Sequence, residues 1–348
     1  MKLLISALEH SANIHLRYLV RELGDEVELC GIFDSSLGES IVDLRSTSIM
    51  GFVDALKKLP FFFRLRDRML ELAATADKVL LIDSSGFNLP LAKAIRKRYP
   101  EKEIIYYILP QAWAWKKKRI PVLERTITKL CSILPFEPSY YSKEAPIEYV
   151  GHPLLDEINI RKRDLSPSGK ITFMPGSRPG EIKRLMPVFR ELRPMLECNA
   201  LLVIPPHFTQ TQVEELYGDI TGFEIVHEAH VSLAESDFAF ICSGTATLEA
   251  ALIGTPFVLV YIAKALDYAI ARRLVKLDYV GLGNILFSHA FGRPLHPELL
   301  QNEVYAQNLY NAYRQTDTAA FFSDAERLRG LLGHGSAKRV SEIIKDLK

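Results

Sequence analysis

The segment Ser243-Gly244-Thr245-Ala246-Thr247-Leu248-Glu249 has the residue types of a phosphate-binding turn. It follows the apolar run Phe238 to Cys242 and precedes a helical pattern, so a strand would end in small hydroxyl residues where a helix begins. The free N–H groups and positive dipole end of such a helix bind phosphate, and Glu249, about one turn further on, could accept hydrogen bonds from a ribose. The same spacing is equally typical of a helix whose Ser and Thr cap its own first turn.

A second turn of this kind is Met174-Pro175-Gly176-Ser177-Arg178-Pro179-Gly180-Glu181. Gly176 and Gly180 permit tight turns, and the Arg178 guanidinium offers a fork of donors to a diphosphate. An isolated arginine on a strand-to-helix turn is usually only a surface residue. Two such turns in one domain favour a nucleoside diphosphate site.

Two carboxylates follow predicted strands in the first half of the chain. Asp83 ends the run Lys78 to Ile82 and precedes Ser84-Ser85-Gly86-Phe87-Asn88, and Glu9 ends the first run. Carboxyl ends of parallel strands face the ligand in doubly wound sheets, so either side chain could act as general base on a bound hydroxyl. An N-cap role for Asp83 fits the same spacing. The sequence leaves open which of the two is the base.

The stretch Gly51 to Leu72 combines apolar and basic side chains. Pro60 would split it into two short helical pieces, which cannot span a bilayer but could lie on one or hold acyl chains. A core helix with cations extending to solvent is the competing interpretation. The residues predicted to contact membrane or acyl chains are Phe52, Val53, Leu56, Phe61, Phe62, Phe63, Arg64 and Arg66.

A basic run, Lys116-Lys117-Lys118-Arg119, follows the two tryptophans of the chain, Trp113 and Trp115. Such a cluster could hold a phosphate or lie at a membrane interface, or it could be the solvated face of a helix with one buried indole. The nine histidines form no ligand pattern, and no HExxH, paired CxxC or GxSxG occurs. We therefore predict no metal site.

These residues require a scaffold of alternating strands and helices. The expected strands of the first domain are Lys2 to Ala7, Val27 to Phe33, Lys78 to Ile82, Ile104 to Ile108, Ser132 to Leu134 and Ile147 to Val150; those of the second are Lys170 to Met174, Ala200 to Ile204, Phe223 to Val226, Phe238 to Ile241 and Phe257 to Val260. A polar stretch from Ile160 to Gly169 looks like a surface linker. We predict an α/β protein with two Rossmann-like doubly wound domains facing a cleft. Residues 1–160 would carry the candidate base and the apolar, basic segment, and residues 161–348 the nucleoside diphosphate site.

Composition narrows the class of protein. At 348 residues, 48% of them hydrophobic, the chain can bury two cores, and its net charge of +1 argues against nucleic acid as a partner. The four cysteines fit no disulfide or metal spacing and are expected to be reduced thiols. No apolar stretch approaches the ~18 residues of a membrane span, so we expect a protein that is neither secreted nor integral to a membrane.

Several segments together resemble the lipid-A-disaccharide synthases, inverting glycosyltransferases of the GT-B type. The matching segments run in the family's order from about Met50 to Gln301: MGFVDALKKLP, LIDSSGFN, the WAWK run, LPFEPSYY, YVGHPLLDEI, MPGSRPGEIKRLMP, SGTATLEA, and YVGLGN with PELLQ. The combination is far more specific than any single motif.

The resemblance implies that the 6-hydroxyl of 2,3-diacylglucosamine 1-phosphate attacks the anomeric carbon of UDP-2,3-diacylglucosamine, giving a β-1,6 bond and UDP. Asp83 matches the family's essential aspartate, Arg178 its essential arginine, and Glu249 would bind the UDP ribose. Helix dipole and Arg178 would stabilise the leaving group, so no metal or cofactor is expected. Three further residues fall in the family's C-terminal conserved stretches and are predicted to bind UDP: Asn284, Arg293 and Gln301.

The resemblance also implies a place in the cell and an assembly. We expect a protein of lipid A and lipopolysaccharide biosynthesis, peripheral on the cytoplasmic face of the inner membrane. A homodimer with exchanged C-terminal segments is expected as well. The family's N-terminal Gly-Glu and Ser-Gly-Asp appear here as Leu8-Glu9-His10-Ser11-Ala12-Asn13.

Other functions fit parts of the pattern. Another UDP-sugar enzyme, such as a UDP-N-acetylglucosamine epimerase or other lipid-linked sugar transferase, would keep the diphosphate site without needing the Gly51 to Leu72 segment. A dinucleotide-dependent oxidoreductase requires GxGxxG after a strand, whereas the first strand is followed by Ala7-Leu8-Glu9. A non-catalytic nucleotide-binding module would tolerate the loss of Asp83.

Overall fold

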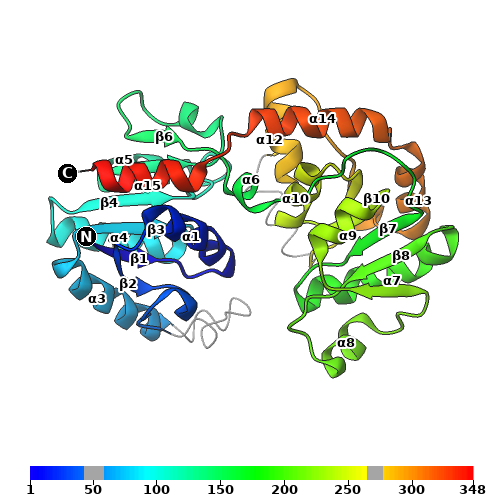
Figure 1. The fold of residues 1–348 in the computed structure, drawn as a ribbon, viewed down its shortest axis with the longest axis horizontal. Helices are drawn as coiled ribbons and strands as arrows, with labels where there is room; N and C mark the ends of the chain where they lie inside the picture. Colours follow the sequence, from blue (N-terminus) through cyan, green and yellow to red (C-terminus); the bar gives the residue numbers. More distant parts are fainter. Residues whose placement is uncertain (43–58, 265–276, 348) are drawn as a thin grey trace. The chain divides into compact units, whose positions relative to one another are not determined.

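The chain folds into two compact units (Figure 1), seen in a computed structural model that describes residues 1–42, 59–264 and 277–347. The first unit contains Met1–Glu157 together with Leu332–Lys348, and the second contains Ile158–Leu331. Each unit has its own six-stranded sheet. All described cysteines are free, as the sequence predicts.

The first unit has an entirely parallel sheet in the order β2-β1-β3-β4-β5-β6. Its strands are β1 (Lys2–Ser6), β2 (Glu28–Ile32), β3 (Lys78–Ile82), β4 (Glu103–Tyr107), β5 (Lys129–Ser132) and β6 (Ile147–Tyr149). Its helices are α1 (His10–Leu23), α3 (Leu59–Thr75), α4 (Ser85–Arg98), α5 (Ile120–Thr126), α6 (Pro153–Glu157) and α15 (Ser336–Asp346).

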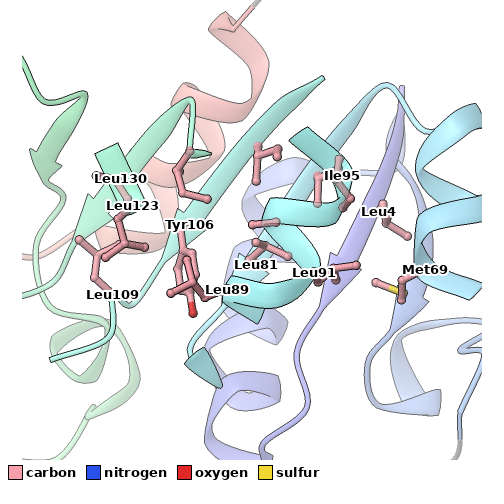
Figure 2. Packing of buried hydrophobic residues seen from close by; sticks show 14 of the residues in the cluster. Leu4, Met69, Leu81, Leu89, Leu91, Ile95, Tyr106, Leu109, Leu123 and Leu130 are labelled. Atoms are coloured by element: carbon pink, nitrogen blue, oxygen red, sulfur yellow. The ribbon is translucent and has the colours of Figure 1, made fainter. Parts of the chain in front are cut away.

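Helices cover both faces of this sheet, which is why its central strands are apolar throughout. Successive residues of a strand point to opposite faces, so Leu4 packs with α3 and α4, whereas Leu3 and Ile5 pack with α1 and α15. Figure 2 shows the first of these cores, in which Met69 lies beside Leu4.

The C-terminal helix lies in the first unit, whereas the sequence predicts that residues 161–348 form one domain. α15 packs on α1 in the first unit, where its apolar stripe, Val340 and Ile344, is fully buried. The Lys78 ammonium donates hydrogen bonds to the carbonyls of Ile344, at 2.5 Å, and Leu347. A cation at the negative end of a helix is favourable, so β3 holds α15 in the first unit.

The second unit repeats the architecture with parallel strands in the order β12-β11-β10-β7-β8-β9. The strands are β7 (Lys170–Met174), β8 (Asn199–Val203), β9 (Phe223–Val226), β10 (Phe238–Cys242), β11 (Phe257–Tyr261) and β12 (Glu298–Leu300). The helices are α7 (Pro179–Leu192), α8 (Gln210–Tyr217), α9 (Ala229–Glu235), α10 (Thr245–Ile253), α12 (Leu282–Phe291), α13 (Ala306–Gln315) and α14 (Thr318–Leu331).

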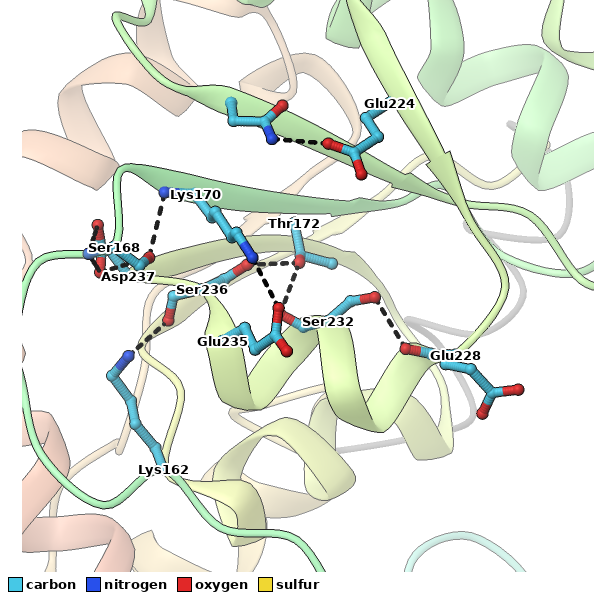
Figure 3. A network of polar contacts seen from close by, with 11 residues as sticks. Lys162, Ser168, Lys170, Thr172, Glu224, Glu228, Ser232, Glu235, Ser236 and Asp237 are labelled. Carbon is cyan, nitrogen blue, oxygen red and sulfur yellow. Dashed lines mark hydrogen bonds and ion pairs between the residues drawn. The ribbon is translucent and has the colours of Figure 1, made fainter.

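A polar network fastens the amino ends of β7 and β10 (Figure 3). The Asp237 carboxylate accepts hydrogen bonds from the backbone of Ser168 at 2.8 Å, and the Thr172 and Ser236 hydroxyls lie 2.7 Å apart. Lys162 donates to the Ser236 carbonyl at 2.8 Å and is buried, so the predicted surface linker is here part of the packed unit. The two strands are thereby fixed at the end opposite to their carboxyl ends.

Candidate functional site

In the first unit, β1 lies between β2 and β3, so the chain leaves β1 toward one side of the sheet and continues on the other. Ligands of doubly wound sheets bind at the carboxyl ends of strands where the order reverses in this way. Glu9 follows β1 and Asp83 follows β3, and the two strands are paired and parallel. The structure therefore places both candidate bases at this switch point.

Asp83 occupies a sharp turn between β3 and α4. Asp83 and Ser84 have positive φ values of 50° and 43°, which non-glycine residues adopt only where the surroundings hold them. The buried Asn88 side chain donates to the Asp83 carbonyl at 2.9 Å and accepts from the Ser6 hydroxyl at 2.6 Å, and the Tyr106 hydroxyl donates to the same carbonyl at 2.6 Å. Strained turns of this kind occur preferentially at functional sites.

The electrostatic environment of Asp83 suits a base. Burial raises the pKa of its carboxyl group above the ordinary value, and the Ser84 backbone N–H and His15 oppose this shift. Glu9, by contrast, is exposed, and its side chain does not cap α1. The turn that carries Glu9 is held by Asn13, which donates to the Glu9 carbonyl at 2.8 Å.

Two neighbouring histidines, His15 and His152, were not predicted as part of the site, and His15 acts electrostatically on Asp83. His15, on α1, hydrogen-bonds the Glu157 carboxylate of α6. His152 is almost fully buried, and burial lowers its pKa to about 3, so it is neutral. The one feature of the sequence that could have pointed to His15 is its position in the second turn of the helix that follows β1.

In the second unit the order reverses between β7 and β10, which are paired and parallel. The turns that follow these two strands are the two predicted phosphate-binding turns. Phe173 of β7 stacks on Phe240 of β10 with ring centres 5.2 Å apart, a contact that packs the two strands together. Both turns therefore lie side by side at the carboxyl edge.

The turn after β7 requires glycine at position 176. Gly176 has φ of +101°, and a Cβ there would lie 2.6 Å from the Glu181 carboxylate. That carboxylate accepts from the Arg178 backbone N–H at 3.3 Å and from its guanidinium at 3.0 Å. The Arg178 side chain is nevertheless 81% exposed, so the remaining donors of its guanidinium face solvent. Ser177 is also exposed.

The turn after β10 opens α10 without a side-chain cap. Its N-cap is Gly244, around which a Cβ would meet nothing within 4 Å, and Thr245 is exposed beside it. Thr247 is buried and donates to the Gly244 carbonyl at 2.8 Å, so it shapes the turn. Ser243 is half-buried between strand and helix. The Thr247 N–H donates to the Gly244 carbonyl at 3.2 Å, so the N–H groups of Thr245 and Ala246 are the ones that the start of α10 offers to an anion.

Glu249 lies one turn into α10 as predicted, but it has a partner that the sequence did not reveal. His230 of α9 contacts its carboxylate at 3.1 Å. The Glu249 side chain is 19% exposed, so one face remains open to a ligand. The pair joins residues of two helices that flank β10.

The three predicted C-terminal residues have different surroundings. Asn284 is fully buried, and its amide bonds the backbone of His296 and the Glu298 carboxylate, so it fastens α12 to β12. Arg293 forms an ion pair with Asp324 of α14 at 2.6 Å. Gln301 follows β12 at the carboxyl edge, with φ of +55°, and its amide nitrogen is buried without a partner in the described part of the chain. Of the three, only Gln301 follows a strand at the same sheet edge as the two candidate phosphate-binding turns and has a buried donor without a partner in the described part of the chain.

In its described part the apolar segment forms one helix, α3, which begins at Leu59; the piece predicted before Pro60 lies outside the described residues, so the division into two pieces stays a prediction. Pro60 is the second residue of α3, a position that tolerates proline. Phe61 and Phe62 are half-buried and pack against the core, and the centre of the Phe62 ring lies 6.0 Å from that of Phe87. Their contact with lipid stays a prediction. Phe63 is 54% exposed with Arg66 over its ring, and Arg64 is exposed.

The other predicted contacts, Phe52, Val53 and Leu56, lie outside the described residues. Within the described ranges, no helix combines the length and apolarity needed to cross a membrane.

Comparisons with known proteins agree with the resemblance. The family model described as "Lipid-A-disaccharide synthetase" matches residues 3–318. The curated lipid-A-disaccharide synthase of Helicobacter pylori strain J99 is 48% identical over 353 residues, covering 98% of this chain and 97% of that protein.

Solved structures show the same fold at low identity. The calicheamicin glycosyltransferase CalG4 has a TM-score of 0.62 at 13% identity, covering 99% of this chain and 97% of that one. A Neisseria meningitidis UDP-GlcNAc 2-epimerase bound to UDP-GlcNAc has a TM-score of 0.61 at 12% identity, covering 99% and 100%. Because a transferase and an epimerase fit about equally well, the fold does not choose between these activities. The family match does, and it disfavours the epimerase.

Proposed function

The chain belongs to the lipid-A-disaccharide synthetase family, and on this premise we propose the reaction that it catalyses. It is a glycosyltransferase that moves the sugar of UDP-2,3-diacylglucosamine to the 6-hydroxyl of 2,3-diacylglucosamine 1-phosphate. The products are the β-1,6-linked lipid A disaccharide 1-phosphate and UDP. The observation that carries the proposal is 48% identity along nearly the whole of both chains.

Asp83 is the general base in this proposal. The new bond joins the acceptor O6 to the anomeric carbon, while the bond from that carbon to the diphosphate oxygen breaks. The hydroxyl proton passes to the Asp83 carboxylate, and the electron pair of the breaking bond leaves with UDP. Asp83 is favoured over Glu9 because the side chains of Asn88 and Tyr106 hold its turn and because burial increases its proton affinity.

The second unit holds UDP. The N-terminus of α10 and the exposed Arg178 guanidinium stabilise the charge that develops on the diphosphate, and Glu249 accepts hydrogen bonds from the ribose. We propose that no metal takes part. In the described residues no group of three or more His, Cys, Asp or Glu could hold a metal ion.

The purified protein is expected to release UDP from UDP-2,3-diacylglucosamine when the acylated acceptor phosphate is present, in EDTA-containing buffer. UDP release is followed by a coupled assay, and the disaccharide is identified by mass spectrometry. Turnover of UDP-N-acetylglucosamine without disaccharide formation would instead support the epimerase alternative. A rate that depends on added Mg²⁺ would contradict the metal-free mechanism.

We also propose that α3 attaches the protein to the cytoplasmic face of the inner membrane. Phe63 is an exposed aromatic ring with cations beside it, a combination suited to an anionic lipid surface. Phe63→Ser is expected to lower binding to anionic vesicles about tenfold, since a buried phenylalanine contributes roughly 1.5–3 kcal/mol. Flotation of variant and wild type measures this. Ile225→Ser, which removes another exposed apolar side chain, on β9, is the control and should float like wild type.

A homodimer completes the proposal, because the family resemblance implies one with exchanged C-terminal segments. The site beside α1 and Lys78 that receives α15 would then accept the same helix from a partner chain. Light scattering that gives the mass of a single chain at micromolar concentration would contradict the dimer.

A further inference from the structure

An aromatic and basic cluster, formed by Trp115, Lys116, Lys117, Arg119 and Tyr140, lies beside the turn that carries the proposed base. The Lys116 ammonium is 3.8 Å from the centre of the Trp115 ring, and the Lys117 ammonium is 5.6 Å from that of Tyr140. The rings are 45% and 36% exposed, so the cluster is open to ligands. The proposed catalytic step leaves all five side chains without a role.

The link between this cluster and the site is Arg119. Its guanidinium donates to the Ser85 hydroxyl at 3.0 Å, and Ser85 is the first residue of α4, two positions after Asp83. Arg119 is thereby held at the positive end of a 14-residue helix. Cations normally lie at the opposite end of a helix, so this placement favours an anion between them.

The cluster carries uncompensated charge. In the described part of the chain, no carboxylate forms an ion pair with any cation from Lys116 to Arg119. Burial and the like charge of Arg119 hold the pKa of Lys116 below its ordinary value. An anion bound by both side chains would relieve this repulsion.

The turn also has unused hydrogen-bonding groups. Ser84 precedes α4, but its hydroxyl does not cap the helix. The same hydroxyl is buried without a hydrogen-bond partner among the described residues. Ser84 and the first N–H groups of α4 therefore add donors to those of Arg119 and Lys116.

We propose that Arg119, assisted by Lys116 and the start of α4, binds the phosphate monoester of the acceptor sugar. The assignment rests on the proposed function. In a glucosamine 1-phosphate, the 6-hydroxyl and the anomeric phosphate lie on either side of the ring oxygen. Asp83 and Ser85 are at most about 7 Å apart along the chain, so one sugar can present its hydroxyl to Asp83 and its phosphate to Arg119. The cluster thus selects an acceptor that carries phosphate and orients it.

Arg119→Gln tests the assignment with two acceptors, the acylated glucosamine with and without its 1-phosphate. The variant should lose about 10- to 100-fold in kcat/KM with the phosphorylated acceptor, the effect of one charged hydrogen-bonding group, and change little with the other. Arg119→Lys keeps the positive charge but lacks the planar set of guanidinium donors, so it should recover part of the rate. The control Arg98→Gln removes an exposed arginine at the far end of α4 and should behave like wild type.

Direct binding separates this assignment from the proposed function. Wild type should bind soluble glucosamine 1-phosphate more tightly than glucosamine in calorimetry, and Arg119→Gln should lose the difference, whether or not UDP is released in the assay. Equal loss with both acceptors would overturn the phosphate site and leave a structural role for Arg119. Unchanged acceptor preference with reduced flotation on phosphatidic acid vesicles would overturn it in favour of a lipid headgroup.

Discussion

Asp83→Asn is expected to lower kcat by about 100-fold or more, with KM for UDP-2,3-diacylglucosamine nearly unchanged. The amide keeps the size of the side chain but cannot accept the acceptor's proton, and a general base typically contributes 10²- to 10⁴-fold. The donor is assigned to the second unit, so its binding should persist. Steady-state rates of UDP release and calorimetric binding of UDP measure the two effects.

The matched control is Glu9→Gln, the same chemical change at the other candidate base. It should retain most of the activity, because Glu9 is exposed and its side chain does not cap α1. A loss at Glu9 with a rate within a few-fold of wild type for Asp83→Asn would reverse the assignment. Thermal unfolding of both variants shows whether either turn has been disturbed.

The pH profile of the wild type is part of the same prediction. Only the deprotonated Asp83 can act as base, so kcat/KM should fall as pH falls through the pKa of this carboxyl group. Burial raises that pKa, which places the acidic limb above the ordinary aspartate value of 3.8. A limb at or below 3.8 would show that the base is a solvated carboxylate.

The framework of the fold was predictable because buried parallel strands are continuous apolar runs. The predicted ranges for β3, β7 and β9 agree with the structure at both ends. β5 runs from Lys129 to Ser132 and shares only Ser132 with the predicted range, although its central residues Leu130 and Cys131 are apolar and fully buried. β12 was missed because a three-residue strand, Glu298–Leu300, carries too few residues for a pattern.

The positions of the site turns were also predictable, since small and charged residues directly after apolar runs must lie at one edge of a parallel sheet. The side chains that hold the turns were not. Asn88 reaches across 82 residues to Ser6, and α15 returns to β3 across more than 260 residues. Contacts between residues so far apart in the chain leave no trace in the local pattern of the sequence. For this reason α15 was assigned to the wrong unit.

The hydrogen bonds that Asn284 forms inside the protein bear on its predicted contact with UDP. The resemblance predicts that Asn284 binds UDP, yet its amide nitrogen donates to the His296 carbonyl and its amide oxygen accepts from the His296 backbone N–H. A buried amide with every hydrogen bond satisfied inside the protein has no group left for UDP. Its substitution should act through the position of β12 and Gln301, which follows that strand.

Arg178→Ala is expected to lower kcat by about 10²- to 10³-fold, the usual effect of removing one donor that stabilises developing charge. Because the side chain is 81% exposed, the midpoint of thermal unfolding should change little. Lys183→Ala, which removes an exposed cation from the same helix, is the control and should leave kcat unchanged. A similar decrease in both variants would indicate a general effect of net charge.

Glu181 makes the Arg178 prediction sharper. Its buried carboxylate lies between Gly176 and Arg178, so removing the guanidinium leaves a negative charge at the edge where the diphosphate would bind. Part of the loss in Arg178→Ala should then come from repulsion as well as from the missing donor. Adding Glu181→Gln, which keeps an oxygen for the Arg178 backbone N–H, should restore part of the rate. If the double variant is as slow as Arg178→Ala, the whole effect belongs to the guanidinium, and Glu181 only holds it in place.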